Sequence, residues 1–350
     1  MYFLAYFYYY FGNIRIVALL SYVYAAFRSR ELTGLSLVTI IAGALVMIKM
    51  IESIEQVGLV GILYCRLYWG WIIFYAYFLS DSKRRLNYIW ILPTVTCLEF
   101  ILVYLFPVLL TILPNYASTD FTSYQIASGL SSGVHSFGGN RTVSSVILAA
   151  LYFYEKGKGG KYKNIFLISC LLVFSGLGTG IIVVGLIKEK LFDSKQIIIK
   201  KLPVTFFISG VLLYLLFGDH GFERVKYSYF SDTIIDYKMN QIEEAQNLFP
   251  FTARNIAFGK FINTSSSELV SDFGITFGDF LALQFAVDNG MIGILAFTLF
   301  LISAMNTVNR IPIIVMVIGT LHYHVIFSMP GQIVFGYLLA VSKKSSIHKN

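Results

Sequence analysis

The stretch that decides the expected fold is Ile165-Phe-Leu-Ile-Ser-Cys-Leu-Leu-Val-Phe-Ser-Gly-Leu-Gly-Thr-Gly-Ile-Ile-Val-Val-Gly-Leu-Ile187. It is apolar except for a Ser/Gly/Thr break at Ser175–Gly180, and it lies between the lysine-rich segment 156–163 and the lysines Lys188 and Lys190. Basic segments next to membrane spans stay in the cytoplasm. The pattern therefore predicts a hairpin that enters the membrane and returns on the same side.

A second stretch has the same layout. Ile311–Val341 lies between Arg310 and Lys343, and we expect its break near His324–Gln332, which contains Pro330-Gly331. Irregular backbone at membrane depth is tolerated only where protein or a water-filled cavity covers it. Two such hairpins predict a cavity around a site, so we expect a substrate that is handled from within the bilayer.

Composition predicts a membrane protein. The chain has 350 residues, of which 57% are hydrophobic and 13% charged, about half the charged fraction of a soluble domain. Further candidate spans are Tyr2–Phe27, Leu35–Ile51, Val57–Leu79, Tyr88–Leu113, Thr142–Tyr154, Leu202–Phe217 and Phe280–Ser303. Asn13 and Arg15 interrupt the first, which is either one helix or a short pair. With the hairpins, this predicts an all-α polytopic membrane protein of about nine to eleven transmembrane segments, in a single domain covering residues 1–350.

The distribution of charge predicts the topology. Loops at 28–31, 81–87, 155–164, 188–201, 309–310 and 342–350 hold 18 of the 27 Lys and Arg residues, whereas 14 of the 19 acidic residues lie elsewhere. The net charge of +8 therefore follows the positive-inside rule and is not a sign of nucleic-acid binding. This places the polar loops 114–141 and 218–279 on the outer side of the membrane in a multi-pass protein.

Two motifs of soluble enzymes are absent from the sequence. It contains no phosphate-binding G-x-x-x-x-G-K-[ST] and no H-E-x-x-H. The three cysteines, Cys65, Cys97 and Cys170, all lie in apolar runs and are typical of buried thiols. We expect no metal and no cofactor.

Three arginines of the predicted outer loops are candidates for binding a phosphate or pyrophosphate. Arg141 follows Asn140 at the start of a span, Arg254 precedes Gly259 by five residues, and Arg224 opens the large loop. A guanidinium donates two parallel hydrogen bonds to such a group. We group Asn140 with the three arginines. The alternative is that the arginines bind lipid headgroups or loop carboxylates.

Acidic residues on the same side are candidates for a general base. Asp279 lies at the entry of the span Phe280–Ser303, and Asp272 is close to it in sequence. A carboxylate at an apolar boundary can accept a proton from a sugar hydroxyl. The alternative for Asp279 is a helix N-cap. His220 is a further candidate base.

Charges inside predicted spans usually face the interior of a helix bundle. Glu99 lies near the middle of its span, and a pair with Arg66 or Arg15 is the structural interpretation. The functional interpretation is a polar lining for a lipid-linked head group or a proton relay. Lys49 lies near the end of another span.

These features together resemble the O-antigen polymerase and O-antigen ligase superfamily. Arg254-Asn-Ile-Ala-Phe-Gly259 is similar to the family's arginine, apolar stretch and glycine in the large periplasmic loop, and Gly139-Asn-Arg141 to an earlier periplasmic arginine. Asp288-Asn-Gly-Met-Ile-Gly293 resembles the Gly-apolar-apolar-Gly of the following span. The break in the first hairpin lacks the arginine that the family often has there. The ligase's His-Asn is replaced by Gly278-Asp279, which favours a polymerase.

The resemblance implies a metal-independent membrane glycosyltransferase that polymerises undecaprenyl-pyrophosphate-linked repeat units into O-antigen or capsule-type polysaccharide. Arg141 and Arg254 would bind the diphosphate, and Asp279 or Asp272 would act as the base. The partners would be a lipid-linked donor and acceptor and membrane lipids, with a chain-length regulator as a candidate.

Three alternatives are a lipid-linked oligosaccharide flippase or polysaccharide exporter, a non-catalytic scaffold, and a ligase. The sequence has no internal duplication of the kind many transporters show.

Overall fold

The computed structural model of the chain is all-helical over its described residues, with no strand among them. The described residues are 2–9, 15–29, 37–57, 68–81, 86, 89–105, 136–173, 175–193, 243, 252–259, 281–305 and 309–347. The all-α class is therefore confirmed for this part of the chain.

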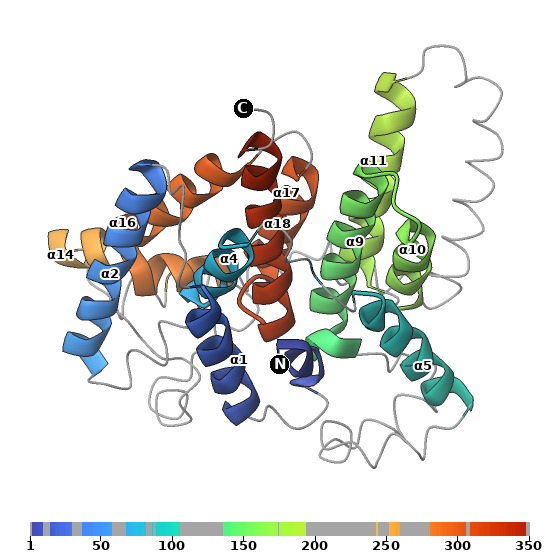
Figure 1. Cartoon of the computed structure of the whole chain (residues 1–350), viewed down its shortest axis with the longest axis horizontal. Helices are drawn as coiled ribbons and strands as arrows, with labels where there is room; N and C mark the ends of the chain where they lie inside the picture. The colour runs from blue at the N-terminus through green and yellow to red at the C-terminus, as the bar shows by residue number, and fades with distance from the viewer. Residues whose placement is uncertain are drawn as a thin grey trace.

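The described residues of the N-terminal half form two short 3₁₀ helices and five α-helices up to Gly157 (Figure 1). They are η1 (Tyr2–Phe7), α1 (Arg15–Arg28), α2 (Leu37–Val57), α4 (Trp71–Leu79), α5 (Ile91–Leu105), η2 (Ser136–Gly138) and α9 (Arg141–Gly157). The first predicted span is thus divided into η1 and α1. The α2 helix continues six residues beyond its predicted end at Ile51, which places Glu52 and Glu55 on the helix.

The remaining described helices cover the two stretches in which membrane hairpins were predicted. They are α10 (Lys163–Leu172), α11 (Gly176–Asp193), α14 (Ala253–Phe258), α16 (Leu281–Ala304), α17 (Arg310–His322) and α18 (Met329–Ile347). Of the predicted spans, Leu202–Phe217 lies outside the described residues.

The first hairpin breaks slightly earlier than the sequence suggested. The α10 helix ends at Leu172, and Gly176 already begins α11, so most of the expected break at Ser175–Gly180 is helical. Both arms pack against α9. A Cβ on Gly178 would come 2.5 Å from the Ser145 Cβ. The backbones of α11 and α9 therefore lie in close contact at this point. The α10 arm, with 10 residues, is about 15 Å long, half the hydrocarbon thickness of a bilayer.

The second break is covered by protein, as the hairpin interpretation requires. Residues 325–328 between α17 and α18 are buried. Side chains form hydrogen bonds with the backbone of this segment. Thr320 Oγ1 accepts from the Ile326 N–H at 3.1 Å, and Gln332 Nε2 donates to the Phe327 carbonyl at 3.1 Å. Pro330 lies in the first turn of α18, where its missing N–H costs no helical hydrogen bond.

An aromatic core joins α4 to α16 and α18. The buried Trp71 ring lies 5.1 Å from Phe300 and 5.3 Å from Phe335, both in edge-to-face geometry. The α4 helix makes its main contact with α18, because Gly336 allows the two backbones to approach.

The outward faces of several helices are apolar as well. On α17, Ile311, Ile314, Ile318 and Leu321 are exposed at helical spacing, whereas Ile313 and Met316 on the other face are buried. A helix that is hydrophobic all round is typical of a membrane span or the core of a large protein.

The lengths of the described helices support fewer membrane spans than the composition predicts. One helix among the described residues, Ala282–Ala304, is long and apolar enough to cross a membrane. Six shorter apolar helical segments in this part of the chain have 10–17 residues.

Candidate functional site

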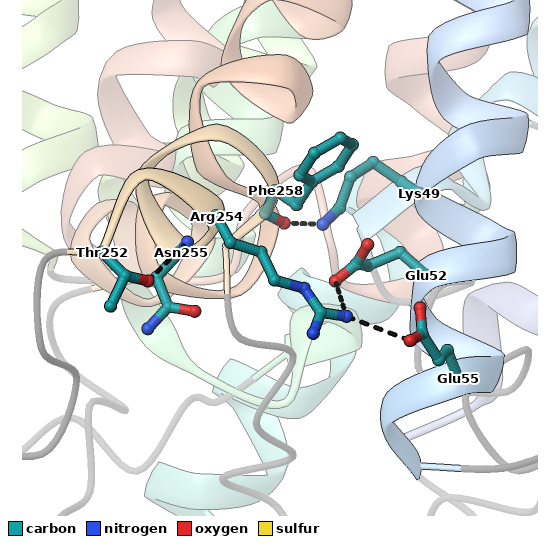
Figure 2. A network of polar contacts seen from close by, with 7 residues as sticks. All are labelled: Lys49, Glu52, Glu55, Thr252, Arg254, Asn255 and Phe258. Atoms are coloured by element: carbon teal, nitrogen blue, oxygen red, sulfur yellow. Dashed lines mark hydrogen bonds and ion pairs between the residues drawn. The ribbon is translucent and has the colours of Figure 1, made fainter.

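The described candidate site centres on Arg254, in the short helix α14. The helix begins because Thr252 caps it: Thr252 Oγ1 accepts from the Asn255 N–H at 3.2 Å. The Arg254 guanidinium reaches α2, where its Nη2 lies 3.1 Å from Glu55 Oε1 and 3.8 Å from Glu52 Oε1 (Figure 2). These carboxylates lie about 200 residues away in the sequence, so the contact joins α2 to the large predicted loop.

The two glutamates orient the Arg254 side chain but contact only one of its three guanidinium nitrogens. Both contacts are made by Nη2, and no described residue accepts a hydrogen bond from Nη1 or Nε. Figure 2 shows the second terminal nitrogen directed away from both carboxylates. The side chain is 61% exposed. An anion can therefore bind the remaining donors of a guanidinium that is already oriented.

Lys49 lies one turn before Glu52 on the same face of α2. It is fully buried, and its Nζ donates to the Phe258 carbonyl at the end of α14 (Figure 2). A cation is favoured near a helix C-terminus, where carbonyls lack helical partners. Lys49 and Glu52 therefore hold the two ends of α14 against α2.

The α14 helix also packs against α16 at a break in that helix. Gly290 has φ 58° and ψ −167°, and Gly259, just after α14, has φ 74° and ψ 179°. A Cβ on Gly259 would come 2.6 Å from the Asp288 carbonyl. Beside this contact, Tyr68 donates to the Asp288 carboxylate at 2.5 Å, and Trp69 Nε1 donates to Asn289 Oδ1 at 3.0 Å.

The second arginine, Arg141, is the first residue of α9. Asn140 is the N-cap of this helix: its Oδ1 accepts from the Thr142 N–H at 2.8 Å. The preceding turn is held by Glu99, which is buried and accepts from the Ser136 N–H at 2.9 Å. Thr96 Oγ1 lies 2.5 Å from Ser136 Oγ. Asn140 therefore has a structural contact in addition to the binding role predicted for it.

The structure places the two arginines on separate parts of the helical assembly. The α14 helix packs against α16, whereas α9 packs against α10, α17, α11 and η2, and the two helices are well apart in Figure 1. The other candidates, Arg224, His220, Asp272 and Asp279, lie outside the described residues.

The charges predicted inside spans have definite surroundings. Glu99 binds the Ser136 backbone; of its predicted partners, Arg66 and the side chain of Arg15 lie outside the described residues. Within the described ranges, no group of three His, Cys, Asp or Glu side chains could hold a metal ion.

Sequence reasoning missed the residues that hold Arg254. Lys49, Glu52 and Glu55 recur at three-residue spacing, a pattern that could have identified one face of a helix. Asp288 was noted only as part of a glycine motif, and nothing in the sequence pairs it with Tyr68. Arg254 does have carboxylate partners, but they lie on the helix α2 and not in a loop, as the alternative interpretation had it.

No family model matches the chain, and comparisons with curated proteins and with solved structures found no significant match.

Proposed function

We propose that this chain is a polytopic glycosyltransferase of the bacterial cytoplasmic membrane that polymerises undecaprenyl-pyrophosphate-linked repeat units at the periplasmic face. The observation that carries the proposal is the oriented and half-exposed guanidinium of Arg254, with donors directed away from Glu52 and Glu55. The fork of a guanidinium matches the paired oxygens of a diphosphate leaving group.

Two features support the membrane placement. Apolar side chains face outward on α1, α2, α5, α10, α16 and α17, where lipid would cover them. The α11 and α18 helices, which carry the lysines of two predicted cytoplasmic segments, end toward the same upper side of Figure 1. Alternation between the predicted cytoplasmic segments 28–31 and 81–87 would also place the end of α2 on the outer side, together with the loop that holds Arg254.

The reaction requires the protein mainly to position the two substrates and to stabilise the charge that develops on the leaving group. A hydroxyl oxygen of the acceptor glycan attacks the anomeric carbon of the donor, and the bond from that carbon to the pyrophosphate oxygen breaks. The hydroxyl proton passes to a base, for which Asp279 and Asp272 are the candidates, and undecaprenyl pyrophosphate leaves with the bonding electrons. Arg254 stabilises the negative charge that develops on the leaving oxygen.

The test is surface-glycan profiling of a strain that lacks the gene, complemented with variants. The deletion strain should still display single repeat units, and Arg254→Ala should insert normally and give the same short glycans. Arg28→Ala is the matched control: Arg28 is an exposed arginine at the end of α1, over the Tyr24 ring, and this variant should give long ladders. Long ladders from Arg254→Ala would remove this residue from the mechanism. Loss of single units from the deletion strain would favour a flippase or exporter instead.

A further inference from the structure

We infer that Tyr68 and Asp288 are positioning residues for Arg254: their hydrogen bond fixes the break in α16 against which α14 packs. Neither residue is placed to touch a substrate, since both side chains are buried. The effect on glycan transfer rests on the proposed function, whereas the placement of α14 can be measured without it.

The break in α16 is stabilised by side chains and is not a loose kink. The backbone of Gly290 is not helical and divides α16 at a kink. Asn289 Nδ2 donates to the Phe285 carbonyl at 3.1 Å, and Asn289 Oδ1 accepts from Trp69. Asn289 is fully buried, and hydrogen bonds in such surroundings are stronger than in water.

Two consecutive residues of one segment bind two consecutive residues of the other. Tyr68 binds Asp288 and Trp69 binds Asn289. The direction of the Tyr68 hydroxyl is itself fixed, because the Tyr68 ring packs edge-to-face on Phe285 at 5.5 Å and on Phe327 at 5.1 Å. This paired contact sets where the backbone of residues 288–290 lies.

The position of the backbone of residues 288–290 determines where α14 lies, because the two are in direct contact. Gly259 lies so close to the Asp288 carbonyl and the Gly290 nitrogen that a methyl group would not fit between them. The Gly259 N–H donates to the Asn255 carbonyl at 2.8 Å, so the glycine is joined to the last turn of the helix. Arg254 lies five residues before Gly259 in a helix of six residues. A shift of the break therefore moves the guanidinium relative to Glu52 and Glu55.

The matched pair of variants is Tyr68→Phe and Tyr154→Phe. Both remove one hydroxyl from a buried tyrosine that bonds another side chain: Tyr154 lies 3.0 Å from the Tyr337 hydroxyl, on α9 and α18. Hydrogen exchange of the full-length protein in lipid nanodiscs should be about tenfold faster at the amides of 253–258 in Tyr68→Phe. The Tyr154→Phe variant should leave those amides unchanged.

A second pair of variants tests the role of the Asp288 carboxylate. Asp288→Asn keeps an oxygen that accepts from Tyr68 and should exchange nearly as the parent does, whereas Asp288→Leu should accelerate exchange of α14. Equal acceleration by Tyr68→Phe and Tyr154→Phe, or no acceleration by Tyr68→Phe, would overturn the assignment.

Glycan profiling separates the two proposals. If Arg254→Ala abolishes long ladders and Tyr68→Phe shortens them, both stand. Normal ladders from Arg254→Ala together with faster exchange of α14 in Tyr68→Phe would refute the proposed function and leave the positioning role intact. Normal exchange in Tyr68→Phe refutes the positioning role whatever the glycans show.

Discussion

Gly259 and Gly290 meet backbone to backbone, each with a positive φ, where α14 packs against the break in α16. A Cβ on Gly290 would come 2.7 Å from the Ala257 carbonyl oxygen and from the Phe258 carbonyl carbon. The contact has no room for any side chain, and both conformations are unfavourable for residues other than glycine.

Gly290→Ala should therefore destabilise the protein by at least about 1–2 kcal/mol, the cost of a left-handed conformation with a Cβ, with steric overlap in addition. The measurement is the apparent unfolding temperature in one detergent. Gly43→Ala is the control, because nothing lies within 4 Å of its added Cβ on α2; it should be neutral or stabilising by about 0.5–1 kcal/mol. Unfolding of Gly290→Ala at the parent temperature would contradict the close contact.

Lys49→Met keeps the apolar stem of the side chain and removes the donor to Phe258. Leaving a buried polar partner unsatisfied costs about 1–3 kcal/mol, so we expect lower thermal stability and faster proteolysis within 252–259. The control is Lys158→Met, which removes a lysine that is 40% exposed and pairs with Glu155. If Lys158→Met lowered the stability as much as Lys49→Met does, the burial of Lys49 would have no special effect on stability.

Glu99→Gln retains an oxygen that accepts from the Ser136 N–H, whereas Glu99→Leu does not. We expect Glu99→Leu to accelerate hydrogen exchange in the turn 136–140 that precedes Arg141, and Glu99→Gln to leave it nearly unchanged. If instead the charge of Glu99 is what matters, for example in a pair with an arginine, both variants will behave alike.

Ile314→Asp distinguishes a lipid-facing surface from a water-facing one. Ile314 is 38% exposed on α17, and in water such a change is usually within about 0.5 kcal/mol of neutral. At the centre of a membrane helix an aspartate costs about 2.5–3.5 kcal/mol. The amount of protein inserted in the membrane fraction should therefore fall. Ile311→Asp, next to Arg310 at the helix end, should be tolerated better; full insertion of Ile314→Asp would argue against lipid on this face.

The helical class could be predicted from the sequence because apolar runs of span length leave few alternatives to helix. A break between two helices near Ser175–Gly180 was also predicted, but its exact position was not. Gly176 to Gly180 look like breakers in isolation, yet the close contact of Gly178 with Ser145 favours a helix that only small residues permit. Tertiary packing overrides local propensity here.

The candidate site was predictable only in part. Arg254 stood out because an arginine before a glycine in a polar loop is a recognisable pattern. Its partners did not, because Glu52 and Glu55 were expected beyond the end of a span, whereas α2 continues to Val57. The bond between Tyr68 and Asp288 joins residues 220 positions apart, and no single sequence reports such a pairing.

Two positive and two negative charges meet where α14 contacts α2, since Lys49 and Arg254 balance Glu52 and Glu55. A bare arginine would retain a diphosphate tightly. An arginine already neutralised by its neighbours binds the same anion more weakly, because the glutamates repel it as it arrives. For the polymerase that we propose, which would have to discharge a spent lipid carrier after every added unit, this arrangement would favour release of product over its retention, and so rapid cycling over tight binding.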